Sequence, residues 1–261
     1  MDFGLHGKTA LVLGGGGGLG KAIAKSLAGE GANVAVAGIR AESIDASRAA
    51  LTAIGVKSLG LVWDLADLTV IDGNISKIEG ELGPVDILIN NTGGPPPTTA
   101  AGQDVALWEK YFKTMVLSLI STTDRVLPGM RARQWGRVIT STSGGVIAPI
   151  PNLALSNTLR LSLVGWSKTL AREVAKDGIT ANIVAPGRIA TDRIKFLDQA
   201  KAKREGRTEE EVMQESLASI PAGRLGKPEE YGDVVAFLAS QQAAYITGSI
   251  IRVDGGMIAS I

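Results

Sequence analysis

A glycine-rich segment near the N-terminus has the composition and context of a phosphate-binding loop. Six of the seven residues from Gly14 to Gly20 are glycine, and Leu19 is the exception. Glycine lets the backbone approach a ligand closely, and the start of a helix presents free N–H groups to a phosphate. A flexible linker has a similar composition, but here a strand pattern precedes the glycines and an amphipathic helix pattern follows them. This context favours dinucleotide binding.

The tip of the second expected strand bears on which dinucleotide binds. An NAD-binding unit of this kind carries an acidic residue about 20 positions after the glycines, where it holds the ribose 2′-hydroxyl. This chain has Ala37-Gly38-Ile39-Arg40 there, with no carboxylate. Arg40 suits a 2′-phosphate, although a solvated arginine after a strand is also common. The segment therefore predicts NADP (NADPH) rather than NAD as the cofactor.

Strand and helix patterns alternate along almost the whole chain. Strands are expected at Thr9–Gly14, Asn33–Ile39, Leu59–Asp64, Val85–Asn91, Arg137–Ser141, Thr180–Ala185 and Ile250–Val253. Helices are expected at Leu19–Gly29, Ala41–Ile54, Leu68–Glu81, Asp104–Met130, Asn152–Asp177 and Pro228–Ser240. This alternation predicts an α/β fold: a doubly wound, Rossmann-type parallel sheet of seven strands flanked by helices, in a single domain of residues 1–261.

Composition and charge exclude several classes of site and partner. The formal net charge is +1, so neither nucleic acid nor an anionic membrane is expected as a partner. The chain has no Cys and only one His, His6, so neither thiolate chemistry nor a metal site is expected. Residues 1–6 lack the features of a signal peptide, and no stretch reaches the roughly 18 apolar residues of a membrane span. A cytoplasmic protein is expected.

Several motifs in order along the chain resemble those of the short-chain dehydrogenase/reductase family. They are Gly14, Gly18 and Gly20 with Leu19 in the loop, Asp64-Leu65, Asn90-Asn91-Thr92-Gly93, Pro186-Gly187 with Ile189 and Thr191, and Val253-Asp254-Gly255-Gly256. The chain is most similar to the 3-oxoacyl-acyl-carrier-protein reductase-like branch. The resemblance implies that Gly14, Gly18, Leu19, Gly20, Asp64, Leu65, Asn90, Thr92, Gly93, Pro186, Gly187, Ile189 and Thr191 bind the cofactor. It also implies strand order 3-2-1-4-5-6-7 and a homotetramer that pairs through the fourth and fifth long helices.

The same resemblance locates a catalytic tetrad in which three residues are replaced. The family uses Ser, Tyr and Lys, with an Asn that supports a proton relay. Here the Ser is kept as Ser143, while the Tyr position holds Ser156 and the Lys position holds Arg160. The Asn position holds Met115, which is expected to make one wall of the site apolar.

These replacements weaken proton transfer. A Tyr titrates near a pKa of about 10 and is tuned by a nearby cation, whereas Ser is a far weaker acid and Arg stays charged. Ser156 and Arg160 are therefore expected to donate hydrogen bonds but to shuttle protons poorly. Tyr111 lies one helical turn before Met115 and is either a substitute proton donor or a core or interface residue.

Two further segments border the expected site. Residues 191–221 are highly charged and contain a capping-box pair, Thr208 and Glu211, and they form either a lid over the carboxyl edge of the sheet or a solvated insertion. The basic residues of this segment either steer an acidic substrate toward the site or form a solvated face. They are Arg193, Lys195, Lys201, Lys203, Arg204 and Arg207. The run Gly94-Pro95-Pro96-Pro97 is either a stiff substrate wall or a rigid solvent loop.

Three functions remain open from these residues. The first is an NADP-preferring oxidoreductase of the 3-oxoacyl reductase type, acting on a small-molecule or acyl-carrier-linked carbonyl or hydroxyl substrate. The second is a catalytically silent relative that binds a nucleotide or acyl ligand. The third is another chemistry on this scaffold, with Ser143 and Arg160 binding an anion such as a carboxylate, which the planar guanidinium suits.

Overall fold

A computed structural model describes residues 2–261 as one layered unit; Met1 lies outside the described residues. The strands are β1 (Thr9–Leu13), β2 (Asn33–Gly38), β3 (Ser58–Val62), β4 (Val85–Asn90), β5 (Gly136–Ser141), β6 (Ile179–Pro186) and β7 (Ile250–Val253). The α-helices are α1 (Gly18–Gly29), α2 (Ala41–Ile54), α3 (Ile71–Leu82), α4 (Val105–Phe112), α5 (Ser118–Arg133), α6 (Ala154–Val174), α7 (Asp192–Glu205), α8 (Glu209–Ala218) and α9 (Pro228–Ala239). Shorter helical turns are η1 (Leu68–Val70), η2 (Lys113–Leu117), η3 (Gly144–Val146) and η4 (Ala175–Asp177).

The sheet confirms the predicted fold class. All strand pairs are parallel, and the order is β3-β2-β1-β4-β5-β6-β7, as the family resemblance implied. The order reverses between β1 and β4, which leaves a crevice at the carboxyl edge of the sheet where open α/β folds bind ligands.

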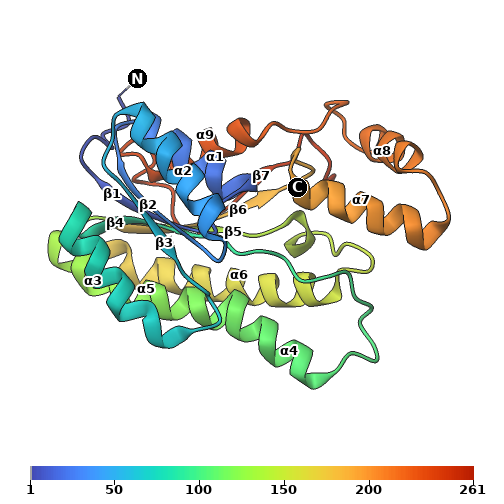
Figure 1. Cartoon of the computed structure of the whole chain (residues 1–261), viewed down its shortest axis with the longest axis horizontal. Helices are drawn as coiled ribbons and strands as arrows, with labels where there is room; N and C mark the ends of the chain where they lie inside the picture. Colours follow the sequence, from blue (N-terminus) through green and yellow to red (C-terminus); the bar gives the residue numbers. More distant parts are fainter. Residues whose placement is uncertain (1) are drawn as a thin grey trace.

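Helices cover both faces of the sheet, which explains why the central strands are buried throughout and rich in apolar residues. Figure 1 shows α1, α2 and α9 on one face and α3, α5 and α6 on the other. In β1 the side chains of Leu11 and Leu13 join the core on the α3–α5–α6 face, while Ala10 and Val12 join the core on the α1–α9 face. Every residue of β1, β4 and β5 is buried.

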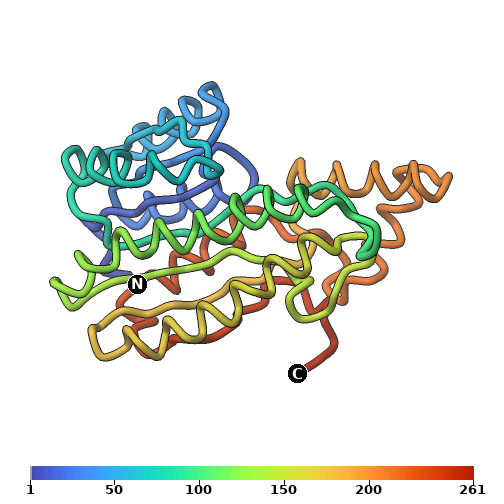
Figure 2. The backbone as a smooth tube through the Cα atoms, turned by 90° about the horizontal axis from the view of Figure 1, so that it is seen from below, coloured from blue at the N-terminus to red at the C-terminus, as the bar shows by residue number. Residues whose placement is uncertain are grey.

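The single long helix expected at Asp104–Met130 is interrupted. It consists of α4, a π-helical turn (η2) and α5, which together form one long rod (Figure 2). Several hydroxyls within it bond to the carbonyl oxygen four residues earlier, including Thr114 to Lys110 at 2.9 Å and Ser118 to Thr114 at 2.6 Å. Such contacts compete with the regular helical bonds and bend helices. The π turn rotates the residues that follow it relative to a continuous α-helix.

The charged segment after β6 forms the helical pair α7 and α8, which extends beyond the sheet layers (Figure 2). The capping box predicted at Thr208 and Glu211 begins α8. Part of the basic charge expected on this segment is paired with acids, because Lys201 and Arg207 form ion pairs with Glu215 of α8. Within residues 2–261, no helix has the length and apolar character needed to cross a membrane.

Candidate active site

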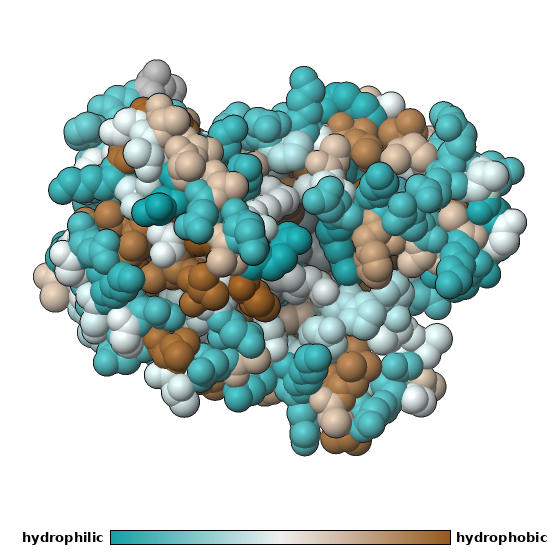
Figure 3. Space-filling view, viewed as in Figure 1, coloured by the Kyte–Doolittle hydropathy of each residue, from teal (hydrophilic) through white to brown (hydrophobic). Residues whose placement is uncertain are grey.

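A cavity of about 820 Å³ opens at the carboxyl edge of the sheet. Figure 3 shows this face of the molecule hollowed near its centre, with hydrophilic residues around much of the rim. The cavity is lined by most of the residues expected to bind cofactor or substrate: Gly14, Gly18, Leu19, Arg40, Leu65, Thr92, Gly93, Ser143, Ser156, Arg160, Pro186, Gly187, Ile189 and Thr191. Three expected residues, Gly20, Asp64 and Asn90, are not among its lining residues.

The glycine loop has the geometry of a phosphate cradle. Gly14 and Gly18 adopt φ of +63° and +52°, a region that favours glycine. A Cβ on Gly20 would lie 2.1 Å from the carbonyl oxygen of Gly14, so Gly20 serves the close packing of loop on helix. No side chain caps the start of α1 and its first turn has no acidic residue, so its N–H groups and partial positive charge face the cavity unopposed. These features fit the pyrophosphate of a dinucleotide.

Asn91 holds this loop and was not singled out from the sequence. Its Nδ2 donates to the carbonyl of Leu13 at 3.1 Å, and the residue lines the cavity. Asn90 is fully buried instead, and its Nδ2 donates to Thr123 Oγ1 at 3.1 Å. Successive residues of a strand point to opposite sides. Asn91 accordingly lines the cavity, whereas Asn90 does not.

The far end of the cavity suits the adenosine portion of the cofactor. Exposed Arg40 lies immediately before α2, and Ser43 in the first turn of that helix also lines the cavity. The apolar side chains of Trp63 and Leu65 form part of the same wall. Asp64 is turned outward and accepts a hydrogen bond from the N–H of Ala66 at 2.9 Å. Ser43 adds a hydroxyl that sequence reasoning missed, because its place depends on how α2 packs beside the loop.

Two serine hydroxyls lie at the other end. Ser143 follows β5 and begins η3, and its Oγ accepts a hydrogen bond from the N–H of Gly145 at 3.1 Å. Since that bond uses a lone pair of the oxygen, the hydroxyl proton remains available to a substrate oxygen. Ser156, in the first turn of α6, is 6% exposed, and its hydroxyl has no hydrogen-bond partner among residues 2–261.

Arg160 lies one turn further along α6 and is 7% exposed. Its Nη1 donates to the carbonyl of Ser141 and its Nη2 to the carbonyl of Thr92, each at 3.2 Å. Burial, with a smaller contribution from the positive charge of Arg193, lowers the pKa of Arg160 to about 10. The guanidinium is still protonated at neutral pH, so this site keeps a buried positive charge where the family has a lysine.

The expectation for Met115 is wrong in one respect. Its side chain is 1% exposed and packs in the core on the α3–α5–α6 face, and it is not among the residues lining the cavity. The π turn carries Met115 inward, and Thr114 and Tyr111 line the cavity in its neighbourhood. Tyr111 is the one tyrosine in the described part of the chain that lines this cavity. The wall is therefore polar.

The start of α7 closes one side of the site. Arg193 lines the cavity, and its Nη2 donates to the carbonyl of Pro95 at 2.6 Å. A Cβ on Gly94 would lie 2.8 Å from that same nitrogen, so the guanidinium packs directly against the backbone of this glycine. The proline run is thus tied to α7, and Pro97 contributes to the cavity wall.

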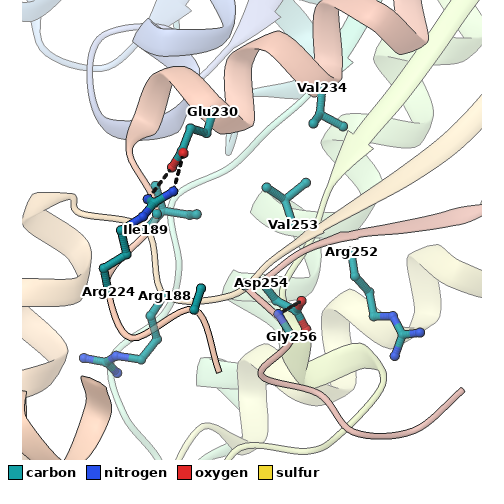
Figure 4. Close-up of a pocket in the computed structure, with 12 residues that line it drawn as sticks. Arg188, Ile189, Arg224, Glu230, Val234, Arg252, Val253, Asp254 and Gly256 are labelled. Atoms are coloured by element: carbon teal, nitrogen blue, oxygen red, sulfur yellow. Dashed lines mark hydrogen bonds and ion pairs between the residues drawn. The ribbon is translucent and has the colours of Figure 1, made fainter. Parts of the chain in front are cut away.

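A second cavity of about 460 Å³ lies beneath the C-terminal motif (Figure 4). Figure 4 shows Arg224 paired with Glu230 through two contacts, at 2.8 and 2.6 Å. Arg188 pairs with Asp198, and Arg252 donates to the carbonyls of Ile258 and Ser260. These charged groups already serve the fold, which leaves the first cavity as the site of chemistry. In residues 2–261 there is no group of three or more His, Cys, Asp or Glu side chains placed to hold a metal ion.

Comparison with known proteins agrees with this geometry. The sequence model of a family described as "Enoyl-(Acyl carrier protein) reductase" matches residues 15–258. The 3-oxoacyl-[acyl-carrier-protein] reductase FabG of Escherichia coli (strain K12) is 38% identical over 259 residues, which cover 98% of this chain and 99% of that protein. Nodulation protein G of Azospirillum brasilense is 36% identical over 251 residues, which cover 96% and 98% of the two chains.

Solved structures show the same architecture. L-sorbose reductase from Gluconobacter frateurii, complexed with NADPH and L-sorbose, superposes with a TM-score of 0.94 over 100% of both chains at 31% identity. YwfH, described as an NADPH dependent reductase involved in Bacilysin biosynthesis, superposes with a TM-score of 0.92 at 30% identity, over 97% of this chain and 99% of that one. This chain belongs to the short-chain dehydrogenase/reductase family and is an NAD(P)-dependent oxidoreductase.

Proposed function

We propose that this protein is an NADP-preferring reductase of the 3-oxoacyl-acyl-carrier-protein reductase type, which interconverts a carbonyl and a hydroxyl in an atypical active site. One observation carries the proposal. A single cavity joins the glycine cradle and Arg40 at one end to Ser143, Ser156 and Arg160 at the other. Such a cavity would hold an extended dinucleotide and bring its reactive end toward the three polar side chains.

The cradle, Asn91 and the segment from Pro186 to Thr191 would hold the dinucleotide, which supplies the hydride. The preference for NADP is supported by Arg40, by the Ser43 hydroxyl and by the partial positive charge at the start of α2. The one acid in the first turn of α2, Glu42, does not line the cavity. A 2′-phosphate would therefore meet an arginine, a hydroxyl and a helix N-terminus.

The serine hydroxyls would bind the substrate oxygen, and proton transfer would be slow. Ser143 donates to that oxygen, and the unpaired Ser156 hydroxyl offers a second hydrogen bond. Neither has the acidity of a tuned tyrosine, and general acid catalysis typically contributes ~10²–10⁴-fold to rate. Tyr111 lines the same cavity and carries a phenol, which is the group that the family's catalytic tyrosine supplies. We expect a working but slow reductase.

Residues 191–221 would act as a lid over the substrate. Seven side chains of α7 line the cavity, namely Asp192, Arg193, Ile194, Leu197, Asp198, Lys201 and Arg204. The bond from Arg193 to Pro95 joins this helix to the opposite rim. A ligand in the cavity must therefore enter beneath or beside α7.

The proposal includes a cytoplasmic homotetramer, the state implied by the family resemblance. It is supported by apolar side chains that remain exposed on the rod of α4 to α5 and on α6. They are Phe112 at 41%, Leu117 at 36% and Leu161 at 51% exposure. Light scattering on the purified protein measures the assembly, and a monomeric mass contradicts this part of the proposal.

The proposed activity is tested by following nicotinamide absorbance with NADPH and methyl acetoacetate, a small neutral 3-oxo compound. We expect slow, protein-dependent oxidation of NADPH that falls about tenfold or more in Ser143→Ala. The variant Ser162→Ala is a matched control, because the hydroxyl of Ser162 bonds to the carbonyl of Leu159 at 2.7 Å and the residue is not among those lining the cavity. Tight NADPH binding with no turnover of any carbonyl compound favours the silent, ligand-binding alternative.

A further inference from the structure

The first cavity is unusually rich in positive charge. Six cationic side chains line it: Arg40, Arg160, Arg188, Arg193, Lys201 and Arg204. Three of them form ion pairs, Arg188 with Asp198, Lys201 with Glu215 and Arg204 with Glu205. Arg40 is exposed at the adenosine end. The two that remain, Arg160 and Arg193, form no ion pair within the described residues 2–261.

Arg160 is the more deeply buried of the pair. Two of its five N–H donors reach backbone carbonyls, and no carboxylate lies within ion-pair distance of it in the described chain. A buried charge is ordinarily matched by a charge of opposite sign. Arg137, also buried, differs in that it uses three backbone carbonyls, stacks on Trp135 and lines neither cavity. The charge of Arg160 thus faces a space where a ligand binds.

Arg193 approaches the same space from α7. One nitrogen is anchored on the carbonyl of Pro95, and its guanidinium lies 5.5 Å from the ring centroid of Phe196. Burial lowers the pKa of Arg193, and the nearby Tyr111 opposes that effect. The absence of a side chain at Gly94 makes room for this guanidinium. The arginine is thus positioned by the protein rather than loose in solvent.

The acids of the cavity do not neutralise this pair. Among residues 2–261, only two carboxylates line it, Asp192 and Asp198. Asp198 is engaged by Arg188, and Asp192 is exposed in the first turn of α7, where it complements the helix dipole. The two guanidinium groups therefore repel one another across the substrate end of the cavity.

We propose that the substrate carries a carboxylate that binds between the guanidinium groups of Arg160 and Arg193, so that the enzyme reduces carbonyl acids in preference to neutral ketones. This inference rests on the proposed function, since it concerns the substrate of the same site. A carboxylate accepts the paired N–H donors of a guanidinium in a bidentate way, and it removes the repulsion between the two cations. Ser156 is one turn before Arg160 on α6, which brings the carboxylate near the carbonyl that the serines bind.

The test compares three 3-oxo acids of increasing chain length, acetoacetate first, each with its methyl ester. Calorimetry measures their binding to the protein with and without NADP⁺, and nicotinamide absorbance measures kcat/KM with NADPH. Removing one partner of a buried charge pair weakens binding by about 30-fold or more. We expect at least one acid to surpass its ester by about that factor, and Arg193→Met to abolish the difference while NADPH affinity is kept. Arg204→Met is the matched control, because Arg204 lines the same cavity but is paired with Glu205.

Each result decides one of the two proposals. If no acid is preferred over its ester, or if Arg193→Met leaves the acid-to-ester ratio unchanged, the carboxylate site is refuted even where NADPH-dependent reduction of the esters proceeds. If acids bind in a manner that depends on Arg193 but neither NADPH binding nor turnover is seen, the carboxylate site stands and the proposed reductase function fails.

Discussion

Arg160 on α6 donates through Nη1 to the carbonyl oxygen of Ser141, at the end of β5, over 3.2 Å. The Oγ of the same serine lies 2.8 Å from the hydroxyl of Tyr231, which donates to the carbonyl of Val184 at 3.1 Å. Burial raises the pKa of Tyr231. That phenol is fully buried and is not among the residues that line the cavity, so it cannot replace the tyrosine missing from position 156.

Restoring the family's tyrosine at position 156 and its lysine at position 160 should restore fast proton transfer. In Ser156→Tyr with Arg160→Lys, we expect the reduction of methyl acetoacetate to rise by ~10²–10⁴-fold, the usual contribution of a general acid. The cavity of about 820 Å³ has room for the larger side chain. The measurement is kcat/KM with saturating NADPH.

The matched control for this experiment is Ser156→Phe with Arg160→Lys, which supplies the ring without the hydroxyl and should gain nothing. If the doubly restored protein binds NADPH but is no faster than the parent protein, the pocket was not shaped for carbonyl reduction.

Two glycines of the loop should respond oppositely to substitution. Gly17 has an extended φ of −176°, a Cβ there would meet nothing within 4 Å, and the residue is the uncapped N-cap of α1. Gly17→Ser should therefore raise the free energy of unfolding by about 0.5–1 kcal/mol, through helix capping and reduced freedom of the unfolded chain. Gly20→Ala should destabilise the protein, because its Cβ would lie 2.1 Å from the oxygen of Gly14. Urea unfolding distinguishes these outcomes, and equal effects of both substitutions contradict the loop geometry.

The contact between α7 and α8 should loosen in acid. Hydrogen bonds from Lys201 and Arg207 lower the pKa of Glu215 to about 2, below its ordinary value of about 4.3. A carboxyl group whose pKa is lower in the folded than in the unfolded protein stabilises the fold. This stabilisation is complete above the ordinary pKa and is lost as the pH falls through the lowered pKa. Amide exchange in α8, corrected for the intrinsic rate, should therefore increase over that window.

Glu215→Gln should remove this pH dependence. Glu210→Gln should retain it, because the carboxylate of Glu210 accepts only a hydrogen bond from Gln214 and forms no ion pair in the described chain. Flat exchange rates in the parent protein across the window would show that the ion pairs do not hold the two helices together.

Local pattern was sufficient to predict the sheet. Runs such as Ala10–Leu13 are apolar because both faces of the strand are covered, and that requirement is visible in sequence. The order of the strands could not be predicted from local pattern, because it depends on which crossover connections pack together. The prediction of that order came from the family resemblance, which is carried by motifs such as Pro186-Gly187. Ser156 and Arg160 were correctly placed near one another, since a spacing of four residues puts them on the same face of α6.

The errors in the site have local physical causes. Met115 was expected in the cavity wall, but the π turn within residues 113–117 directs it into the core, and no residue type announces such a turn. Asn91 was passed over for Asn90, although alternation along a strand distinguishes them. The interpretation of the basic residues in 191–221 did not include Glu215, which lies on the second helix, α8, and pairs with Lys201 and Arg207. Among the basic residues of this segment that line the cavity, Arg193 is the one that forms no ion pair within residues 2–261.

The most direct measurement is a titration of the purified protein with NADPH and with NADH, followed by nicotinamide fluorescence, in the parent protein and in Arg40→Ala. Charge-assisted hydrogen bonds to the 2′-phosphate should make NADPH bind about 10- to 100-fold more tightly than NADH, and Arg40→Ala should remove most of that difference while NADH affinity is unchanged. Failure of both nucleotides to bind at millimolar concentration would contradict the assignment of this cavity to a dinucleotide, and equal binding of the two would contradict the role of Arg40.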